Sequence, residues 1–384
     1  MLRAIMAEGS DRPEPILFAT AARGTEGAVR DELRDLGFRG VRADRGGVHF
    51  GRSLDEGFRA ALELRTALRV LMRLSTFEAP DEDALYEGVS AIDFRPYLTA
   101  HHTLAVRAFC RDSRLTHSQF IAQKTKDAIV DQLRARTGAR PSVDLDDPDV
   151  TLFVHLVSDR ATVYLDLTGS SLHKRGWRAR ALDAPLKESL AAAILRLSGW
   201  DRERPLVDPM CGSGTIAIEA ALWARQIAPG LARDRFGFER WASHDEAAVR
   251  RMKELREQAK AKIRSEQPPI VGSDVDLGAL SVARENAAAA GVNVTFRRAS
   301  IRDLAPLSPP GIMVTNPPYG ERLEAPDELF VDLARAIARL RGHRAVILAG
   351  APSIVQHVRT RPSKSLVVYN GDIECRLLTY DVPG

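Results

Sequence analysis

The first part of the chain alternates apolar runs with amphipathic stretches. Short apolar or alternating runs predict three strands, at residues 16–20, 47–50 and 70–77. Between them, apolar residues recur at helical spacing and predict helices at residues 25–36 and 54–68. This order is typical of a small α+β sheet with its helices on one face. No combination of residues typical of catalysis falls within it.

A second region, residues 78–170, combines two predicted helices with three predicted strands. The helices are expected at residues 83–92 and 118–136, and the strands at 103–109, 151–157 and 162–167. The apolar residues expected to face inward from the long helix are Phe120, Ile121, Ala128, Ile129 and Leu133. Its other face carries Lys124, Lys126, Arg134 and Arg136, which either meet phosphate or remain solvated, the commoner case.

From about residue 184 the pattern changes to helices alternating with short apolar strands. Such alternation predicts a parallel sheet covered by helices on both faces, an α/β fold. Strands are expected at residues 205–208, 270–273, 292–296, 312–315, 344–349, 366–369 and 374–380. The sequence Asn-Gly-Asp at residues 370–372 is typical of a hairpin turn, so the last two strands should be antiparallel. Residues 246–263 predict an added helix between the first two strands.

Composition narrows the class of protein. The chain has 384 residues, of which 45% are hydrophobic and 28% charged, a balance typical of globular proteins of two or three domains. No run of about 18 uncharged apolar residues could span a membrane, and residues 1–15 lack the apolar stretch of a signal peptide. Three widely spaced cysteines indicate neither a disulfide framework nor a metal site. We therefore expect a cytoplasmic protein.

A glycine loop follows the first strand of the C-terminal region. Asp208 ends the strand, and Gly212 and Gly214 follow just before a predicted helix. Glycines there let the backbone turn tightly and let a ligand approach at the carboxyl end of a parallel strand. By itself a Gly-x-Gly is usually only a turn. No Lys follows Gly214, as a nucleoside triphosphate loop would require, and the three-glycine dinucleotide motif is also absent.

Two further strand ends carry polar groups. Asp274 ends the second strand, where a carboxylate can accept hydrogen bonds from two ribose hydroxyls. Asp276 precedes a predicted helix and is interpreted as its cap. The fourth strand runs into Asn316, Pro317, Pro318 and Tyr319. An exocyclic amine can donate to the Asn316 side-chain oxygen and the Pro317 carbonyl while Tyr319 stacks on its ring, whereas Asn-Pro-Pro alone is often only a turn.

These motifs together resemble the class I S-adenosylmethionine-dependent methyltransferases that modify amino groups. Residues 174–178 (Lys-Arg-Gly-Trp-Arg), 186–190 (Leu-Lys-Glu-Ser-Leu) and 208–215 (Asp-Pro-Met-Cys-Gly-Ser-Gly-Thr) look like the THUMP-domain RNA guanine-N2 methyltransferases. Residues 236–241 (Phe-Gly-Phe-Glu-Arg-Trp) also resemble the enzymes of that group that act on large-subunit (23S) rRNA. The resemblance implies a ferredoxin-like domain at residues 1–77, a THUMP RNA-binding domain at 78–170 and a Rossmann-like methyltransferase domain at 171–384.

The resemblance also implies S-adenosylmethionine as cofactor. The expected cofactor-binding residues are Asp208, Met210, Cys211, Gly212, Gly214, Asp274, Val275, Ser300, Ile301, Asp303 and Asn316. Met210 stands where the general methyltransferase loop has its first glycine, and Ser300 stands where the family often has Gly-Asp. Adenine recognition is thereby left open between the Ser300 hydroxyl, the Ile301 backbone and Asp303. The expected catalytic residues are Asn316, Pro317, Pro318 and Tyr319.

RNA is the implied partner, and basic residues are the candidates to hold it. The net charge is only +4, but residues 172–180 hold four Lys or Arg and a Trp. The predicted phosphate contacts are Lys124, Lys126, Arg134, Lys174, Arg175 and Arg178. The competing interpretation of the second group is a solvated linker whose Trp177 packs into a neighbouring domain. The rival functions are tRNA guanine-N2, adenine-N6 and protein glutamine methylation, or RNA binding without activity. A monomer is expected.

Overall fold

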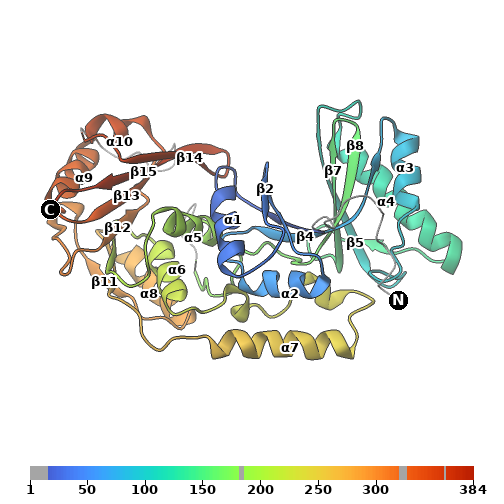
Figure 1. Cartoon of the computed structure of the whole chain (residues 1–384), viewed down its shortest axis with the longest axis horizontal. Helices are drawn as coiled ribbons and strands as arrows, with labels where there is room; N and C mark the ends of the chain where they lie inside the picture. The colour runs from blue at the N-terminus through green and yellow to red at the C-terminus, as the bar shows by residue number, and fades with distance from the viewer. Residues whose placement is uncertain (1–15, 181–185, 320–326, 359) are drawn as a thin grey trace.

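The computed structural model describes residues 16–180, 186–319, 327–358 and 360–384. The described chain forms an elongated molecule with one β-sheet in its N-terminal half and another in its C-terminal half (Figure 1). Helix α7 (Glu246–Ala261) belongs to the C-terminal half of the sequence but lies beneath the N-terminal half (Figure 1). A segment from the C-terminal half of the sequence is therefore part of the N-terminal half of the molecule.

The N-terminal sheet is continuous across the two regions that the sequence pattern separates. Its eight strands have the order β2-β3-β1-β4-β8-β7-β5-β6. They are β1 (Leu17–Thr20), β2 (Arg42–Asp44), β3 (Gly47–Phe50), β4 (Arg69–Glu78), β5 (Thr103–Arg111), β6 (Ser142–Val143), β7 (Val150–Val157) and β8 (Arg160–Asp166). The ten-residue β4 pairs with β1 on one side and β8 on the other, so it joins both regions.

Four helices pack against this sheet: α1 (Glu26–Asp35), α2 (Leu54–Glu63), α3 (Glu82–Ser90) and α4 (Ser118–Thr137). Helix α2 begins with a capping box formed by Ser53 and Glu56, and it ends five residues before the predicted 68 because Leu64 takes an extended conformation. The buried stripe of α4 contains Ile121, Ala128, Ile129 and Leu133, as predicted. Phe120 lies one position outside this stripe and is 41% exposed, so its predicted inward orientation is wrong.

The C-terminal sheet has the predicted seven strands and terminal hairpin. The order is β11-β10-β9-β12-β13-β15-β14, and β15 is antiparallel to both neighbours, while the remaining neighbours are parallel. The strands are β9 (Leu206–Asp208), β10 (Ile270–Asp274), β11 (Thr295–Arg298), β12 (Ile312–Thr315), β13 (Arg344–Ala349), β14 (Lys364–Asn370) and β15 (Ile373–Asp381). Because β9 lies centrally, the loop that follows it is flanked by the ends of β10 and β12.

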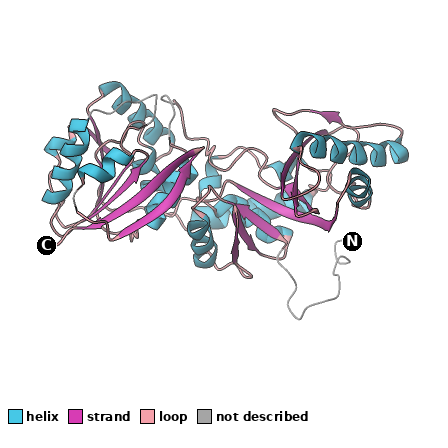
Figure 2. Cartoon of the chain, turned by 90° about the horizontal axis from the view of Figure 1, so that it is seen from above, coloured by secondary structure: helices cyan, strands magenta, loops and turns pink. Residues whose placement is uncertain are grey.

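Helices cover both faces of this sheet (Figure 2). One core includes residues of α5 (Glu188–Leu197), α6 (Thr215–Ala224) and α8 (Leu277–Ala289). A second core on the other face includes residues of α9 (Asp327–Arg339) and α10 (Pro352–His357). This arrangement explains why the strands read as continuous apolar runs rather than as alternating ones.

The segment between α6 and β10 packs on the N-terminal half of the molecule. Its two short helices are η1 (Pro229–Ala232) and η2 (Gly237–Arg240). Phe236, Phe238 and Trp241 are buried in the same core as the N-terminal helices, and the Phe238 ring stacks on Phe58 of α2 at 4.1 Å between centroids. Burial of these aromatic side chains fixes the N-terminal half against the inserted segment.

Candidate active site

The loop after β9 turns tightly at two glycines with different surroundings. Gly212 and Gly214 have φ of +50° and +82°, in the left-handed region that favours glycine. A Cβ on Gly214 would lie 3.0 Å from the Phe296 ring and 3.1 Å from Ala283, whereas a Cβ on Gly212 would meet nothing within 4 Å. Gly214 therefore permits close packing onto α8, while Gly212 opens onto free space beside the loop.

Hydrogen bonds hold this loop against the ends of the neighbouring strands. The Cys211 amide donates to the Ser273 carbonyl at 3.0 Å, and the Gly212 amide donates to Asp274 Oδ2 at 2.9 Å. Asp274 Oδ1 accepts from the Asp276 amide at 3.0 Å. A carboxylate has about four acceptor positions, so Asp274 keeps capacity for ribose hydroxyls. Asp276 caps α8 through the Gly278 amide at 2.7 Å, which confirms that prediction.

Asp208 is a buried carboxyl at the centre of the sheet edge. Thr315 Oγ1 at the end of β12 donates to Asp208 Oδ1 at 2.9 Å, and the Met210 amide lies 3.4 Å from the same oxygen. Burial, with a smaller contribution from the nearby Asp274, raises the pKa of Asp208 to about 7. The group therefore holds its proton to a much higher pH than an ordinary aspartate does. The Cys211 thiol is also buried, and burial raises its pKa, which disfavours the nucleophilic thiolate.

The residues expected at the adenine differ in their surroundings. Val275 directly follows Asp274 and is 60% exposed, although it is apolar. Ile301 is buried, and Ser300 caps the short helix η3 (Ile301–Asp303) by accepting from the Arg302 amide at 3.3 Å. Asp303 is exposed. The Ser300 hydroxyl thus already has a structural role, while Val275 offers an apolar surface that a flat ring could cover.

The Asn-Pro-Pro-Tyr segment begins where β12 ends. The side-chain oxygen of Asn316 is buried and has no hydrogen-bond partner among the described residues. Pro317 is buried and Pro318 is half-buried. An unpaired buried acceptor is costly, so such an atom in a native protein needs an explanation. A ligand that donates an N–H to Asn316 would supply one.

The Tyr319 side chain packs against residues that follow β13 or belong to the hairpin of β14 and β15. Asn370 Nδ2, at the end of β14, donates to the Tyr319 hydroxyl at 2.9 Å, and the Cys375 thiol lies 3.7 Å from it. Gly350 makes room for the ring, because a Cβ there would collide with it. Burial raises the pKa of Tyr319. Sequence reasoning did not single out Gly350, Asn370 or Cys375 for this site; Asn370 carried only the signal of a hairpin turn.

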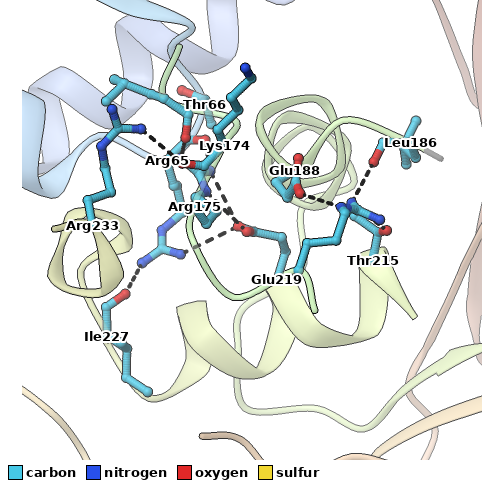
Figure 3. A network of polar contacts seen from close by, with 12 residues as sticks. Arg65, Thr66, Lys174, Arg175, Leu186, Glu188, Thr215, Glu219, Ile227 and Arg233 are labelled. Atoms are coloured by element: carbon cyan, nitrogen blue, oxygen red, sulfur yellow. Dashed lines mark hydrogen bonds and ion pairs between the residues drawn. The ribbon is translucent and has the colours of Figure 1, made fainter. Parts of the chain in front are cut away.

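Arg175 does not lie on an RNA-accessible surface as predicted. Arg175 is 2% exposed, and its guanidinium donates to Glu219 Oε1 of α6 at 3.2 Å, to the Leu172 carbonyl at 2.8 Å and to the Arg65 carbonyl (Figure 3). The prediction that Arg175 contacts phosphate is therefore wrong: burial excludes RNA, and its charge is balanced by Glu219.

Arg178 is used to support the glycine loop. It donates to Glu188 Oε1 at 2.7 Å, to Ser213 Oγ at 3.3 Å and to Thr215 Oγ1 at 3.2 Å. Arg178 is half-buried and has internal partners, so its predicted contact with phosphate stays a prediction. Trp177 is buried in the core of α5 and α6, in agreement with the competing interpretation that this Trp packs into a neighbouring domain.

The other predicted phosphate contacts remain at the surface but are not gathered in one place. Lys124 lies 3.4 Å from Glu82, and Lys126 lies 2.9 Å from Asp127. Arg134 and Lys174 are exposed. Helix α4 lies at the end of the molecule far from the C-terminal sheet (Figure 1). The lysines of α4 are thus partly neutralised and remote from the glycine loop.

The described residues contain neither a membrane-spanning helix nor a cluster of metal-binding side chains. Within residues 16–180, 186–319, 327–358 and 360–384, no helix is long and apolar enough to cross a membrane. Over the same part of the chain, no group of three or more His, Cys, Asp or Glu side chains is placed to hold a metal ion.

Comparison with known protein families finds three successive matches. Residues 16–71 match the RlmL ferredoxin-like domain, residues 79–166 match the THUMP domain, and residues 175–379 match the RMKL-like methyltransferase domain. The last match alone covers more than half of the chain.

Individual proteins are similar over nearly all of this chain. The ribosomal RNA large subunit methyltransferase K/L of Syntrophotalea carbinolica is 44% identical over 95% of this chain and 53% of its own length. The chain thus spans about half the length of the curated relatives it matches.

Two crystal structures cover the chain at full length. SMU.472 in complex with SAH is 32% identical, with a TM-score of 0.85 over 97% of this chain and 100% of that one. A Listeria monocytogenes protein described as a predicted N6-adenine-specific DNA methylase is 31% identical, with a TM-score of 0.85 over 96% of each chain.

Proposed function

The chain belongs to the family of RMKL-like methyltransferases, and from this premise we propose that it methylates the exocyclic N2 of a guanosine in 23S rRNA, with S-adenosylmethionine as the methyl donor. The relatives named ribosomal RNA large subunit methyltransferase K/L support the choice of RNA. The SAH bound to SMU.472 supports the choice of cofactor. An rRNA substrate would place the protein in the cytoplasm.

We also propose that the chain divides into a ferredoxin-like domain at residues 1–77, a THUMP domain at 78–170 and a methyltransferase domain at 171–384. The three family matches support these limits. In the continuous N-terminal sheet, β4 pairs with strands of both of the first two domains.

The residues at the carboxyl ends of β9 and β10 fit the cofactor. Gly212 leaves open space beside the loop, and Asp274 keeps acceptor capacity for two ribose hydroxyls. Val275 offers an exposed apolar surface for the adenine. The buried Ile301, together with Met210, Cys211, Gly214, Ser300 and Asp303, belongs to the surrounding loops. Asp208, whose pKa is near 7, can ionise when a positively charged ligand binds close by. The cofactor when bound supplies an electrophilic methyl group.

The single observation that carries the reaction is the unpaired side-chain oxygen of Asn316. Guanine N2 can donate one N–H to this oxygen and the other to the Pro317 carbonyl, while Pro318 stiffens the turn. These bonds favour the pyramidal amine and stabilise the positive charge that would develop on nitrogen as the N–C bond forms and the S–C bond of the cofactor breaks, leaving the neutral thioether. Release of one N–H proton to solvent would then make the nitrogen neutral again. We propose that Tyr319, whose ring is only half-buried, contacts the flipped base.

A second candidate acceptor is the N6 amine of adenine. The same Asn316 oxygen would accept from that amine equally well, and one full-length structural relative is described as an N6-adenine-specific DNA methylase. The THUMP match favours RNA over DNA as substrate. Methylation of tRNA uses the same chemistry and differs only in how the RNA is held.

The test is methyl transfer from labelled cofactor to 23S rRNA and tRNA transcripts, followed by identification of the modified nucleoside. We expect N2-methylguanosine from rRNA. Asn316→Ala should abolish transfer while cofactor affinity, measured by calorimetry, stays near wild type. Asn293→Ala, at an exposed position, is the matched control. Wild-type turnover in Asn316→Ala would refute the proposed amine site, and N6-methyladenosine as product would favour the second candidate.

A further inference from the structure

The N-terminal sheet has one face that no helix of the described chain covers. The helices α1 to α4 share a core with alternate strand residues such as Leu17, Val48, Val70 and Leu152. The intervening residues point to the other face, where a separate cluster contains Phe18, Leu71, Tyr164 and Phe153 and therefore draws on strands alone. In Figure 1, α3 and α4 both lie on the same side of β5, β7 and β8.

Aromatic and histidine rings form a row across this uncovered face. The row runs from His49 on β3 through Phe18 on β1, Tyr164 on β8 and His155 on β7 to Phe109 on β5. Successive ring centroids are 4.7, 5.9, 5.1 and 6.2 Å apart. With the neighbouring Phe153, we call this set the aromatic sheet face. Its members are brought together by register: His49 is opposite Phe18, Phe153 opposite Tyr164, and Phe109 opposite His155.

One end of the row is open to solvent. The Phe109 ring is 52% exposed, although phenylalanine is usually buried. His155 beside it is half-buried, and burial lowers its pKa, so its imidazole is uncharged at neutral pH. A single exposed phenylalanine would need no explanation. The Phe109 ring meets His155 edge-on, with 75° between the ring planes, and its exposed side is a flat apolar surface at the open end of the row.

Arginines surround the rings on the same face. Register places Arg42 opposite His49, Arg73 opposite Tyr164, Arg107 opposite Phe153, and Arg160 opposite Glu78. Arg69 and Asp166, also on this face, form an ion pair with each other. The other carboxylates that the described strands carry on this face are Asp44 and Glu78, so arginines outnumber acids there. Its charge therefore complements a polyanion.

We propose that the aromatic sheet face binds an unpaired segment of the substrate RNA, with bases stacked on Phe109 and His155 and phosphates contacting Arg107 and Arg160. This inference rests on the proposed RNA substrate. Sheets that present aromatic rings beside basic residues bind single-stranded RNA in this way, because every base has a flat face to stack. In a duplex those base faces are already stacked on each other, which favours an unpaired strand.

The combination of rings and arginines on the aromatic sheet face favours RNA over a protein as its partner. A protein partner would cover the apolar rings, but only an acidic one would match the surplus of arginines on this face. An RNA strand needs both groups at once, since its bases stack and its phosphates carry charge. The surface is also distinct from the basic side of α4, whose two lysines lie close to carboxylates.

The experiment compares two exposed phenylalanines of the same domain. Phe109→Ala removes the platform, whereas Phe120→Ala, on α4 behind the sheet, removes a similarly exposed ring. Affinity for a fluorescein-labelled, unstructured oligoribonucleotide is measured by anisotropy on the full chain. We expect Phe109→Ala to weaken binding by about 5- to 100-fold, the effect of losing one stacking platform. Phe120→Ala should bind like wild type, and Phe109→Tyr should restore affinity because the ring is kept.

Three outcomes would overturn this proposal. One is equal affinity of Phe109→Ala and Phe120→Ala for the oligoribonucleotide. Another is an equal loss by Phe109→Ala for a blunt RNA duplex, which has no free bases to stack. The third is a salt dependence unchanged in Arg107→Gln, where removal of one phosphate contact should reduce the slope by about 0.7. Methyl transfer is measured separately, so failure to modify any RNA would refute the proposed function while leaving the binding result intact.

Discussion

Replacing Arg175 with methionine should destabilise the protein strongly. The substitution keeps an unbranched apolar chain but removes the guanidinium that faces Glu219, which is completely buried. The other cation near Glu219 is Arg65, whose Nη1 lies 3.9 Å away and has no hydrogen-bond partner among the described residues (Figure 3). The variant therefore leaves a buried carboxylate with a distant partner.

The size of this loss of stability follows from the distance between Arg175 and Glu219 and from the burial of both side chains. Two unit charges 3.2 Å apart, the Arg175 Nε to Glu219 Oε1 distance, attract by about 5 kcal/mol at an effective dielectric constant of about 20. Truncating one partner of a buried pair typically costs about 3 to 5 kcal/mol. We therefore expect a loss in that range. The double variant Arg175→Met/Glu219→Leu should be more stable than Arg175→Met, because it removes the uncompensated charge together with its partner.

Thermal and urea unfolding, followed by circular dichroism, measure this effect. The matched control is Arg180→Met, which breaks an arginine–glutamate pair of the same 3.2 Å length with Glu285 at the surface. Exposed pairs contribute at most about 1 kcal/mol, so this control should change stability little. Equal losses in the two single variants, or a double variant less stable than Arg175→Met, would refute the reasoning that burial makes the pair essential.

Three further predictions concern the active site. Burial raises the pKa of Asp208 from 3.8 to about 7, so between these pH values the folded state binds a proton that the unfolded state has lost. The wild-type protein should therefore lose stability relative to Asp208→Asn as the pH rises from about 4 to about 7. Unfolding at a series of pH values will measure this difference. Asp274→Ala should weaken S-adenosylmethionine binding by about 1.5 to 3 kcal/mol in calorimetry, from lost bonds to a charged acceptor. Asn370→Ala and Tyr319→Phe should each reduce kcat by about fivefold, with no further loss in the double variant, because both break the same 2.9 Å hydrogen bond.

Much of the C-terminal sheet could be predicted from local pattern. The predicted limits of β12 and β13 agree with the structure, since each is an apolar run ended by a turn residue. Strands β2 and β6 were missed because they have three and two residues and are exposed. Strand β11 starts three residues later than predicted, at Thr295, because Val292 packs into the core without being part of the strand.

Part of the candidate site could also be predicted from the sequence pattern. Asp208 and Asp274 end parallel strands and Asn316 directly follows one, and neighbouring parallel strands bring their carboxyl ends to one edge of the sheet. The surroundings of Tyr319 could not be predicted, because Gly350, which follows β13, and Asn370, at the end of β14, meet Tyr319 only through the packing of the terminal strands. A basic stretch of sequence was also a poor guide to RNA contact, because Arg175 lies in such a stretch and yet is one of the most deeply buried side chains.

The sequence by itself determined what depends on neighbouring residues: the apolar runs that become strands, the glycines that permit a tight loop and the polar groups at strand ends. The tertiary structure alone decided which distant residues meet. It joined two regions through β4, placed the aromatic segment after Phe236 in the N-terminal core, and buried Arg175 against Glu219. The physical reason is that burial and pairing are properties of the packed chain, since a side chain's environment is supplied by segments far away in sequence.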